Sequence, residues 1–309
     1  MDCLVLAGDR KNYVKVANRK NKAFLDIGGR TILRVILEEL QDVEEIDRFV
    51  VVGPLDALQA EVDAIGADLR KDVQLIEQEN DLVSNILIGV HATAYGKPLD
   101  RHYLVMSSDI PLITAEEVRQ FIQLSDMSLY DYVGGVTTEK AIQRFAPSDD
   151  ESGVRMALFQ GKEGRFRINN LHMVRPSAVR YMEYIRRTYA VRYQKQFLNM
   201  IRMAGGLFGA LMRAPGSAPL FMGFQMAAFC DNRDWKRLAA FVRKGNSCER
   251  AARYISKILG TRFKIAVTSY GGAAVDVDND EDYAIISQRH SEWLAMQKRL
   301  GESEPGFLM

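Results

Sequence analysis

Residues 102–124, HYLVMSSDIPLITAEEVRQFIQL, carry a strand pattern followed by a helix pattern. The apolar run at 103–105 predicts a buried strand, and residues 115–124 predict the helix behind it. Asp109 stands three residues past the strand and is followed by Ile110 and Pro111. Thr114 is the better cap for the helix, so the carboxylate of Asp109 is left for another role.

The same alternation of strand and helix runs through the first 140 residues. Short apolar runs predict four more strands, and apolar residues at helical spacing predict helices between them. These strands are continuously apolar, which is typical of a parallel sheet covered on both faces. We therefore predict an α/β fold, a mostly parallel Rossmann-like sheet with helices on both faces. The additional strands are expected at residues 3–8, 48–53, 73–78 and 131–136.

Beyond residue 146 the pattern changes. Short strands are predicted around the turn from Gly161 to Gly164, and residues 177–260 are mostly helical in pattern. Strand character returns at 262–269, and an amphipathic helix is expected from Asp280 onward.

Composition indicates an ordinary soluble protein, with 47% hydrophobic and 26% charged residues in a chain of 309. Three scattered cysteines exclude a disulfide framework and favour a reducing compartment. The N-terminus has no signal-peptide pattern, and no apolar run is long enough to span a membrane. We expect a cytoplasmic protein. The net charge of +1 argues neither for nor against nucleic acid, and we predict no such partner.

A basic loop follows the first predicted strand in residues 4–33, LVLAGDRKNYVKVANRKNKAFLDIGGRTIL. Between residues 9 and 22, six cations oppose the single carboxylate of Asp9, so the field of the loop favours a polyanion such as a phosphate chain. Glycine lets backbone N–H groups approach phosphates closely. A solvated basic loop is the alternative that composition alone leaves open.

This stretch resembles the signature of nucleotidyltransferases with the glycosyltransferase-A-like fold, the group of molybdenum-cofactor guanylyltransferases and sugar-phosphate nucleotidyltransferases. Residues 22–33, KAFLDIGGRTIL, fit the second half of the signature, and Lys22 falls on its phosphate-binding lysine. Asp9 departs from it by replacing a glycine. Arg10 is the nearest candidate for the family arginine, with Lys15 as a fallback. The resemblance also assigns nucleotide contacts to Leu6, Ala7 and Gly8.

The segment DLVSNILIGVHAT, residues 81–93, matches the family's Gly/Ser-rich entry to a helix. By resemblance, Ser84 and Asn85 would read the edge of the nucleotide base. Serine and asparagine are also common helix N-caps, so capping is the competing interpretation.

Asp109 and Pro111 resemble the family's Asp-x-Pro motif, whose aspartate binds Mg²⁺. Mg²⁺ prefers hard oxygen ligands, usually one or two carboxylates together with substrate phosphates. Near the C-terminus, AAVDVDNDEDYAII resembles the family's second metal-binding segment, with Asp278 on its aspartate. Asp276 lies two residues upstream, on the same side of an extended chain. We predict a magnesium site formed by Asp109 and Asp278. An acidic first turn of the last helix is the alternative interpretation.

The segment RINNLHMVRP, residues 167–176, corresponds to a strand that faces the acceptor in the family. Asn170, His172 and Arg175 are the candidate acceptor contacts, together with Asn169. A single histidine on a strand is more often structural, and Arg175 could equally lie on the surface.

Between residues 177 and 230 the only acid is Glu183, although seven cations occur there among tyrosines and an apolar run. We expect residues 177–259 to form a helical insertion packed on the acceptor side of a nucleotidyltransferase domain made of 1–176 and 260–309. Peripheral contact with an anionic membrane through 177–230 is the less favoured alternative.

The resemblance implies an Mg²⁺-dependent enzyme that converts an NTP and a phosphorylated acceptor, a sugar or polyol phosphate, into an NDP-linked product and pyrophosphate. Lys22, Arg10 and Asp109 would carry the reaction. A molybdopterin-type acceptor, a glycosyltransferase that consumes a nucleotide-sugar and a non-catalytic nucleotide-binding regulator are the alternatives.

Overall fold

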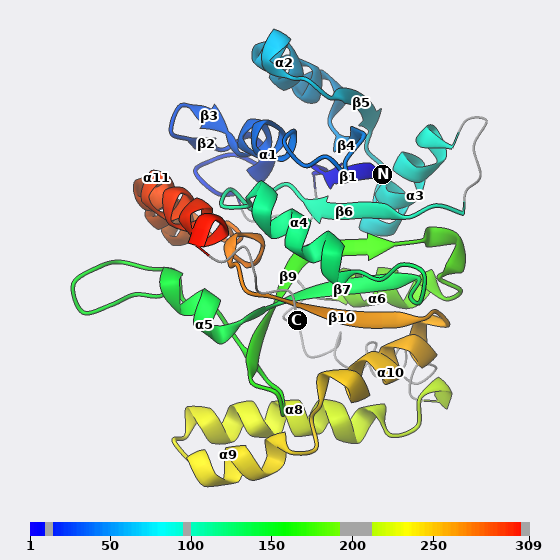
Figure 1. The fold of residues 1–309 in the computed structure, drawn as a ribbon, viewed down its shortest axis with the longest axis vertical. Helices are drawn as coiled ribbons and strands as arrows, with labels where there is room; N and C mark the ends of the chain where they lie inside the picture. Colours follow the sequence, from blue (N-terminus) through cyan, green and yellow to red (C-terminus); the bar gives the residue numbers. More distant parts are fainter. Residues whose placement is uncertain (10–14, 95–99, 192–211, 304–309) are drawn as a thin grey trace.

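The structure is a computed structural model that describes residues 1–9, 15–94, 100–191 and 212–303. Its centre is a twisted sheet whose strands follow the order β10-β7-β9-β6-β1-β4-β5 (Figure 1). All neighbouring pairs along this path are parallel except those of β9, which runs antiparallel to both β6 and β7. The predicted α/β fold with a mostly parallel sheet is therefore confirmed.

The strands and helices lie close to the ranges that the sequence predicts. The strands of the path are β1 (Asp2–Leu6), β4 (Arg48–Gly53), β5 (Asp72–Glu77), β6 (Tyr103–Ser107), β7 (Tyr132–Thr138), β9 (Arg165–Val174) and β10 (Phe263–Thr268). Three short strands accompany them, β2 (Asp26–Ile27), β3 (Arg30–Thr31) and β8 (Phe159–Gln160).

Helices cover both faces of the sheet, as two separate apolar clusters show. Along β1, Cys3 and Val5 belong to one cluster, whereas Leu4 between them belongs to the other. The first cluster is completed by α1 (Ile32–Leu40), α2 (Leu55–Ile65), α4 (Ala115–Leu124) and α11 (Asp280–Ser303). The second is completed by α3 (Leu82–Thr93), α6 (Met182–Val191) and α10 (Cys248–Leu259).

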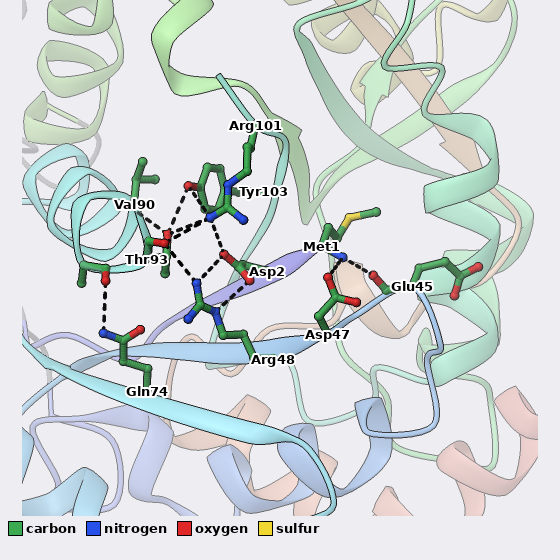
Figure 2. Close-up of polar contacts among 11 residues, drawn as sticks. Met1, Asp2, Glu45, Asp47, Arg48, Gln74, Val90, Thr93, Arg101 and Tyr103 are labelled. Atoms are coloured by element: carbon green, nitrogen blue, oxygen red, sulfur yellow. Dashed lines mark hydrogen bonds and ion pairs between the residues drawn. The ribbon is translucent and has the colours of Figure 1, made fainter. Parts of the chain in front are cut away.

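A charged cluster fastens the amino ends of β1, β4 and β6, at the opposite edge from the ends where ligands bind in such sheets. Two guanidinium groups bind the buried carboxylate of Asp2 (Figure 2): Arg48 donates to both of its oxygens at 2.8 and 3.0 Å, and Arg101 donates at 2.9 Å. Burial opposes ionisation of Asp2, but Arg48 and Arg101 outweigh it and hold the pKa of its carboxyl below the ordinary value. This cluster serves the fold.

Two of the helices after β9, α8 (Ser217–Asn232) and α9 (Lys236–Arg243), extend beyond the edge of the sheet (Figure 1). The short helix α9 lies alongside α8, and α8 also contacts β8. A four-residue helix, α5 (Glu139–Ile142), follows β7. Among the helices in the described residues, none is both long enough and apolar enough to cross a bilayer.

Candidate active site

Three carboxylates meet at the carboxyl edge of the sheet. Asp109 follows β6, and Asp276 and Asp278 follow the 3-10 turn η5 (Gly272–Ala274). A ligand oxygen of each lies within 4.8 Å of the others. The predicted pair of Asp109 and Asp278 is thus brought together, and Asp276 joins it. The hydroxyl of Ser107 donates to Asp109 at 2.6 Å and orients its carboxylate.

Backbone contacts hold the two acidic loops in register. The N–H of Val277 donates to the C=O of Asp109 at 3.0 Å. From α4, the carboxyl of Glu117 accepts the N–H of Ala273 at 2.9 Å. From α11, the ring Nε2 of His290 lies 3.0 Å from the C=O of Pro111, beside Asp109. Two helices on one face of the sheet therefore set the positions of both loops.

A third segment brings a cation to the acids. Lys22 begins the 3-10 turn η1 (Lys22–Phe24), and its Nζ lies 3.0 Å from Oδ1 of Asp278 and 3.6 Å from Oδ2 of Asp109. The preceding residue, Asn21, caps η1 through Oδ1 and donates its amide to the C=O of Ala7 at 2.7 Å. Asn21 therefore ties the lysine turn to the end of β1. Asn21 is not among the predicted site residues, although asparagine before a short turn is a common capping signal.

The cluster carries more negative than positive charge. Three carboxylates face Lys22 and Arg167, whose guanidinium donates to Asp276 at 2.6 Å. Burial, followed by the charges of Asp109 and Asp278, raises the pKa of Asp276 above its ordinary value. Hard oxygen ligands and an excess of negative charge are what a divalent cation such as Mg²⁺ requires. The residues present therefore fit a metal site.

The end of β1 lies against the start of α3. A Cβ placed on Gly8 would lie 2.8 Å from the side-chain Nδ2 of Asn85, so a side chain there would crowd this contact. The Oδ1 of Asn85 accepts the N–H of Glu79 at 2.6 Å. Helix α3 is capped by Asp81 rather than by Ser84 or Asn85. Ser84 instead donates its hydroxyl to Asp81 at 2.7 Å.

Two cavities meet beside the acidic cluster. One is walled by apolar residues of α3, α6 and the sheet and reaches Leu6, Asp109 and Asp278. The other is a groove of about 830 Å³ between β9 and α8, and Asp276 is one of its lining residues. Asn170 and His172, two of the predicted acceptor contacts, line both cavities.

His172 is neutral in this position. Desolvation lowers the pKa of its ring to about 4, and its Nδ1 lies 3.2 Å from the hydroxyl of Tyr132. Asn170 donates its amide to the C=O of Ala273 at 3.1 Å. Both side chains therefore have structural partners at the rim of the cavities.

Arg175, the third predicted acceptor contact, lies away from the acidic cluster and the two cavities. Because β9 is antiparallel to β6, Val174 at its end pairs with Tyr103 at the beginning of β6. Arg175 consequently lies at the amino edge, where its guanidinium contacts Asp131 and His102. The structure does not bring it to the acidic cluster, and the expectation of an acceptor contact at Arg175 is not retained.

Of the basic loop, Arg10 lies outside the described residues. Lys15 and Asp9 are exposed, and the backbone N–H of Asp9 donates to the side chain of Gln78. The side chain of Asp9 is exposed next to Gly8. Ala17 further along the loop donates its N–H to Asp280 at 2.6 Å, which connects the loop to the beginning of α11.

A mostly parallel sheet with a carboxylate cluster at its carboxyl edge and a lysine beside it is an arrangement that nucleotidyl-transferring enzymes use. Residues 3–218 match the family model described as the MobA-like NTP transferase domain. The chain therefore belongs to that family. Its members transfer a nucleotidyl group from an NTP, so the protein is a nucleotidyltransferase.

Solved structures share the fold. One similar structure is a hypothetical transferase from Thermus thermophilus, with a TM-score of 0.62 and 19% identity, covering 91% of this chain and 98% of that one. Another is 4-diphosphocytidyl-2C-methyl-D-erythritol synthase from Anaerococcus prevotii, with a TM-score of 0.50 and 12% identity, covering 94% and 97% respectively. No curated protein matches the chain.

Proposed function

We propose that this protein is an Mg²⁺-dependent nucleotidyltransferase that joins the nucleotidyl group of an NTP to a phosphorylated acceptor, a sugar or polyol phosphate, and releases pyrophosphate. The observation that carries the proposal is the meeting of Asp109, Asp276 and Asp278 at the sheet edge, within reach of Lys22. Acidic ligands and a phosphate-binding cation are the two things that transfer at an α-phosphate needs.

In the proposed reaction an oxygen of the acceptor phosphate attacks the α-phosphorus, and the bond to the β-phosphate oxygen breaks. Bound to the three aspartates, Mg²⁺ would neutralise the charge that develops on the α-phosphate. Lys22 would contribute its charge to the triphosphate, and the backbone at Gly8, at the end of β1, would lie beside the nucleotide. Catalysis then consists of positioning and electrostatics, with no covalent enzyme intermediate.

The groove between β9 and α8 is the proposed acceptor site. Its volume of about 830 Å³ lies within the range of roughly 300–1,000 Å³ that is usual for small-molecule sites. It reaches Asp276, and polar side chains suited to hydroxyl and phosphate groups line it, including Asn169 and Asn170. His172 at its rim is neutral, so it can hydrogen-bond a hydroxyl group without adding charge.

Pyrophosphate release tests the proposal. The four NTPs are incubated with Mg²⁺ and a panel of sugar and polyol phosphates, and the released pyrophosphate is measured with a coupled inorganic pyrophosphatase and detection of the phosphate formed. We expect release that requires both Mg²⁺ and one acceptor, and that is lost in Asp109→Asn. Glu281→Gln, which alters an exposed acid at the start of α11, is the matched control and should keep full activity. Absence of acceptor-dependent pyrophosphate with every pair would refute the proposal.

A further inference from the structure

Helices α8 and α9 expose an apolar surface that the fold does not use. Eight of the twelve large apolar side chains that are exposed in the described residues lie in the short segment from 212 to 241. The other four are scattered singly, which is normal for a soluble protein. The eight, which we call the apolar patch, are Met212, Phe221, Met222, Met226, Phe229, Trp235, Leu238 and Phe241.

Helix α8 is apolar all round, a pattern typical of a buried helix. Its inner face packs against the rest of the protein. Ala227 and Cys230 are buried, and the ring of Phe224 lies edge-on to that of Phe159, with the two centroids 5.8 Å apart. The outer face carries Phe221 and Met222, which are 63% and 62% exposed. The rest of the described residues does not cover this apolar outer face, which is therefore open to a partner.

The patch continues from α8 onto α9. The rings of Phe229 and Trp235 lie in edge contact with centroids 6.1 Å apart, across the turn between the two helices. On α9, Leu238 and Phe241 extend the patch, with Phe241 70% exposed. The two helices lie side by side at one end of the molecule, beyond the sheet (Figure 1). One flat partner could therefore touch both.

The net charge of the segment that carries the apolar patch favours an anionic lipid surface over a second copy of this chain as its partner. Residues 212–244 contain six cations and two acids, a net charge of +4, whereas the whole chain has a net charge of +1. A second copy of this chain would bring +4 against +4, which opposes association through this face. An anionic lipid surface instead attracts the cations and takes up the aromatic and aliphatic side chains. The cations are Arg213, Arg233, Lys236, Arg237, Arg243 and Lys244.

We propose that α8 and α9 dock the protein on the surface of an anionic phospholipid membrane, with the apolar patch inserted among the headgroups. The exposed cations Arg233, Lys236, Arg237 and Lys244 would lie against the lipid phosphates, whereas Arg213 stacks on Tyr181 and Arg243 donates to Gln160. The inner side of α8 lines the groove that leads to Asp276, so docking would hold the opening of that groove near the membrane. The proposal does not depend on which nucleotide or acceptor the enzyme uses.

Co-sedimentation of the full chain with lipid vesicles tests the proposal. Vesicles of equal parts phosphatidylglycerol and phosphatidylcholine are compared with pure phosphatidylcholine, each at low and high salt. We expect binding to the anionic vesicles that weakens at high salt, and much weaker binding to the neutral ones. Arg237→Glu should weaken anionic binding by more than about fivefold, since each surface cation contributes roughly that factor.

Two further variants test the apolar contribution. The double substitution Phe221→Ser and Phe241→Ser should reduce anionic binding by roughly tenfold or more, because it removes two side chains that would leave water. Leu129→Ser is the matched control, since Leu129 is 59% exposed but lies outside the patch. Thermal unfolding of each variant confirms that its fold is intact. Light scattering of the free protein shows whether the patch pairs two copies.

Three results would overturn the proposal. These are no sedimentation with anionic vesicles, equal sedimentation with both kinds of vesicle, or binding that the patch variants leave unchanged. A dimer that the double substitution dissociates, with no vesicle binding, would assign the patch to a second copy instead.

Discussion

The backbone N–H of Val277 donates to the C=O of Asp109 at 3.0 Å, although 168 residues separate the two in the chain. This hydrogen bond joins the loop after β6 to the loop after η5, so the metal-binding candidates Asp109 and Asp278 are held by main chain rather than by their own side chains. Their carboxylates contact the side chains of Ser107 and Lys22 and are not what joins the two loops. Loss of one carboxylate should consequently affect ligand binding far more than folding.

Asp278→Asn tests this separation of binding from folding. A ligand at about 100 times its Kd stabilises a protein by roughly 2.7 kcal/mol, so Mg²⁺ together with NTP should raise the Tm of the wild type measurably. We expect Asp278→Asn to lose this rise while its Tm without ligand stays within a few degrees, because removing a charge from a crowded acidic cluster costs little. Differential scanning fluorimetry with and without Mg²⁺ and NTP measures both quantities. A normal ligand-induced rise in the variant would contradict a role of Asp278 in the site.

Lys22→Ala should weaken NTP binding more than acceptor binding. In the structure Lys22 bridges Asp278 and Asp109, and a triphosphate would offer it a stronger counter-charge. A loss of about 2 kcal/mol in NTP affinity is expected for a charge-assisted contact. Calorimetric titration of NTP and of the acceptor into each protein gives the two affinities. Lys20→Ala, in the same loop and exposed, is the control, and equal effects of the two substitutions would assign Lys22 to nonspecific loop charge.

Asp9→Gly restores the glycine that the resemblance leads one to expect. The carboxylate of Asp9 is exposed next to Gly8, and its backbone N–H is already bound to Gln78. If the carboxylate faces the triphosphate, its removal should tighten NTP binding by about tenfold. A tenfold change in affinity corresponds to about 1.4 kcal/mol, which is roughly the repulsion between two like charges near a protein surface. The same titration measures the change. Weaker binding in Asp9→Gly would instead make Asp9 a contributor to the site.

Much of the fold follows from local pattern. Residues 82–93 were expected to be helical and form α3, and Thr114 caps α4 with its hydroxyl as the sequence indicates. Asp109 and Asp278 could be chosen because each follows a strand or precedes a helix in a recognisable motif. Such signals depend on residues that are close together in the chain, which is why the sequence contains them.

The direction of β9 was not available from pattern. The resemblance placed His172 and Arg175 together as acceptor contacts, and the sequence of a strand does not tell whether it runs parallel or antiparallel to its neighbours. In the antiparallel β9, His172 faces the cavities while Arg175 lies at the amino edge beside Asp131. Glu117 was likewise missed, because its role depends on a loop 156 residues away.

At the amino edge of the sheet, Asp2→Asn should destabilise the fold. The substitution leaves Arg48 and Arg101 without the buried carboxylate that binds them (Figure 2), and breaking such a partly buried pair costs about 3 kcal/mol. Because the pKa of Asp2 is lowered in the fold, the wild type should lose this contribution as pH falls below the ordinary value of 3.8. Urea unfolding measures the difference. Asp47→Asn, at a 75% exposed side chain of the same edge, is the control and should change stability by less than about 0.5 kcal/mol.

Glu117 should make stability depend on pH in the neutral range. Desolvation raises the pKa of its fully buried carboxyl from 4.5 to about 8, so between these values the unfolded chain releases a proton that the folded protein keeps. Folding then binds a proton, and the free energy of unfolding must fall as pH rises from about 4.5 to about 8.

Glu117→Gln removes this titration while keeping an oxygen that can accept the N–H of Ala273. The stability of the wild type relative to Glu117→Gln should therefore fall by a few kcal/mol between pH 5 and pH 8, since one unit of pKa shift corresponds to about 1.4 kcal/mol. Urea unfolding of both proteins at the two pH values gives the difference, in which the other titrating groups cancel. A difference that does not change with pH would show that the Glu117 carboxyl ionises normally in the fold. Glu117 would then accept the N–H of Ala273 as a charged carboxylate rather than as a neutral acid.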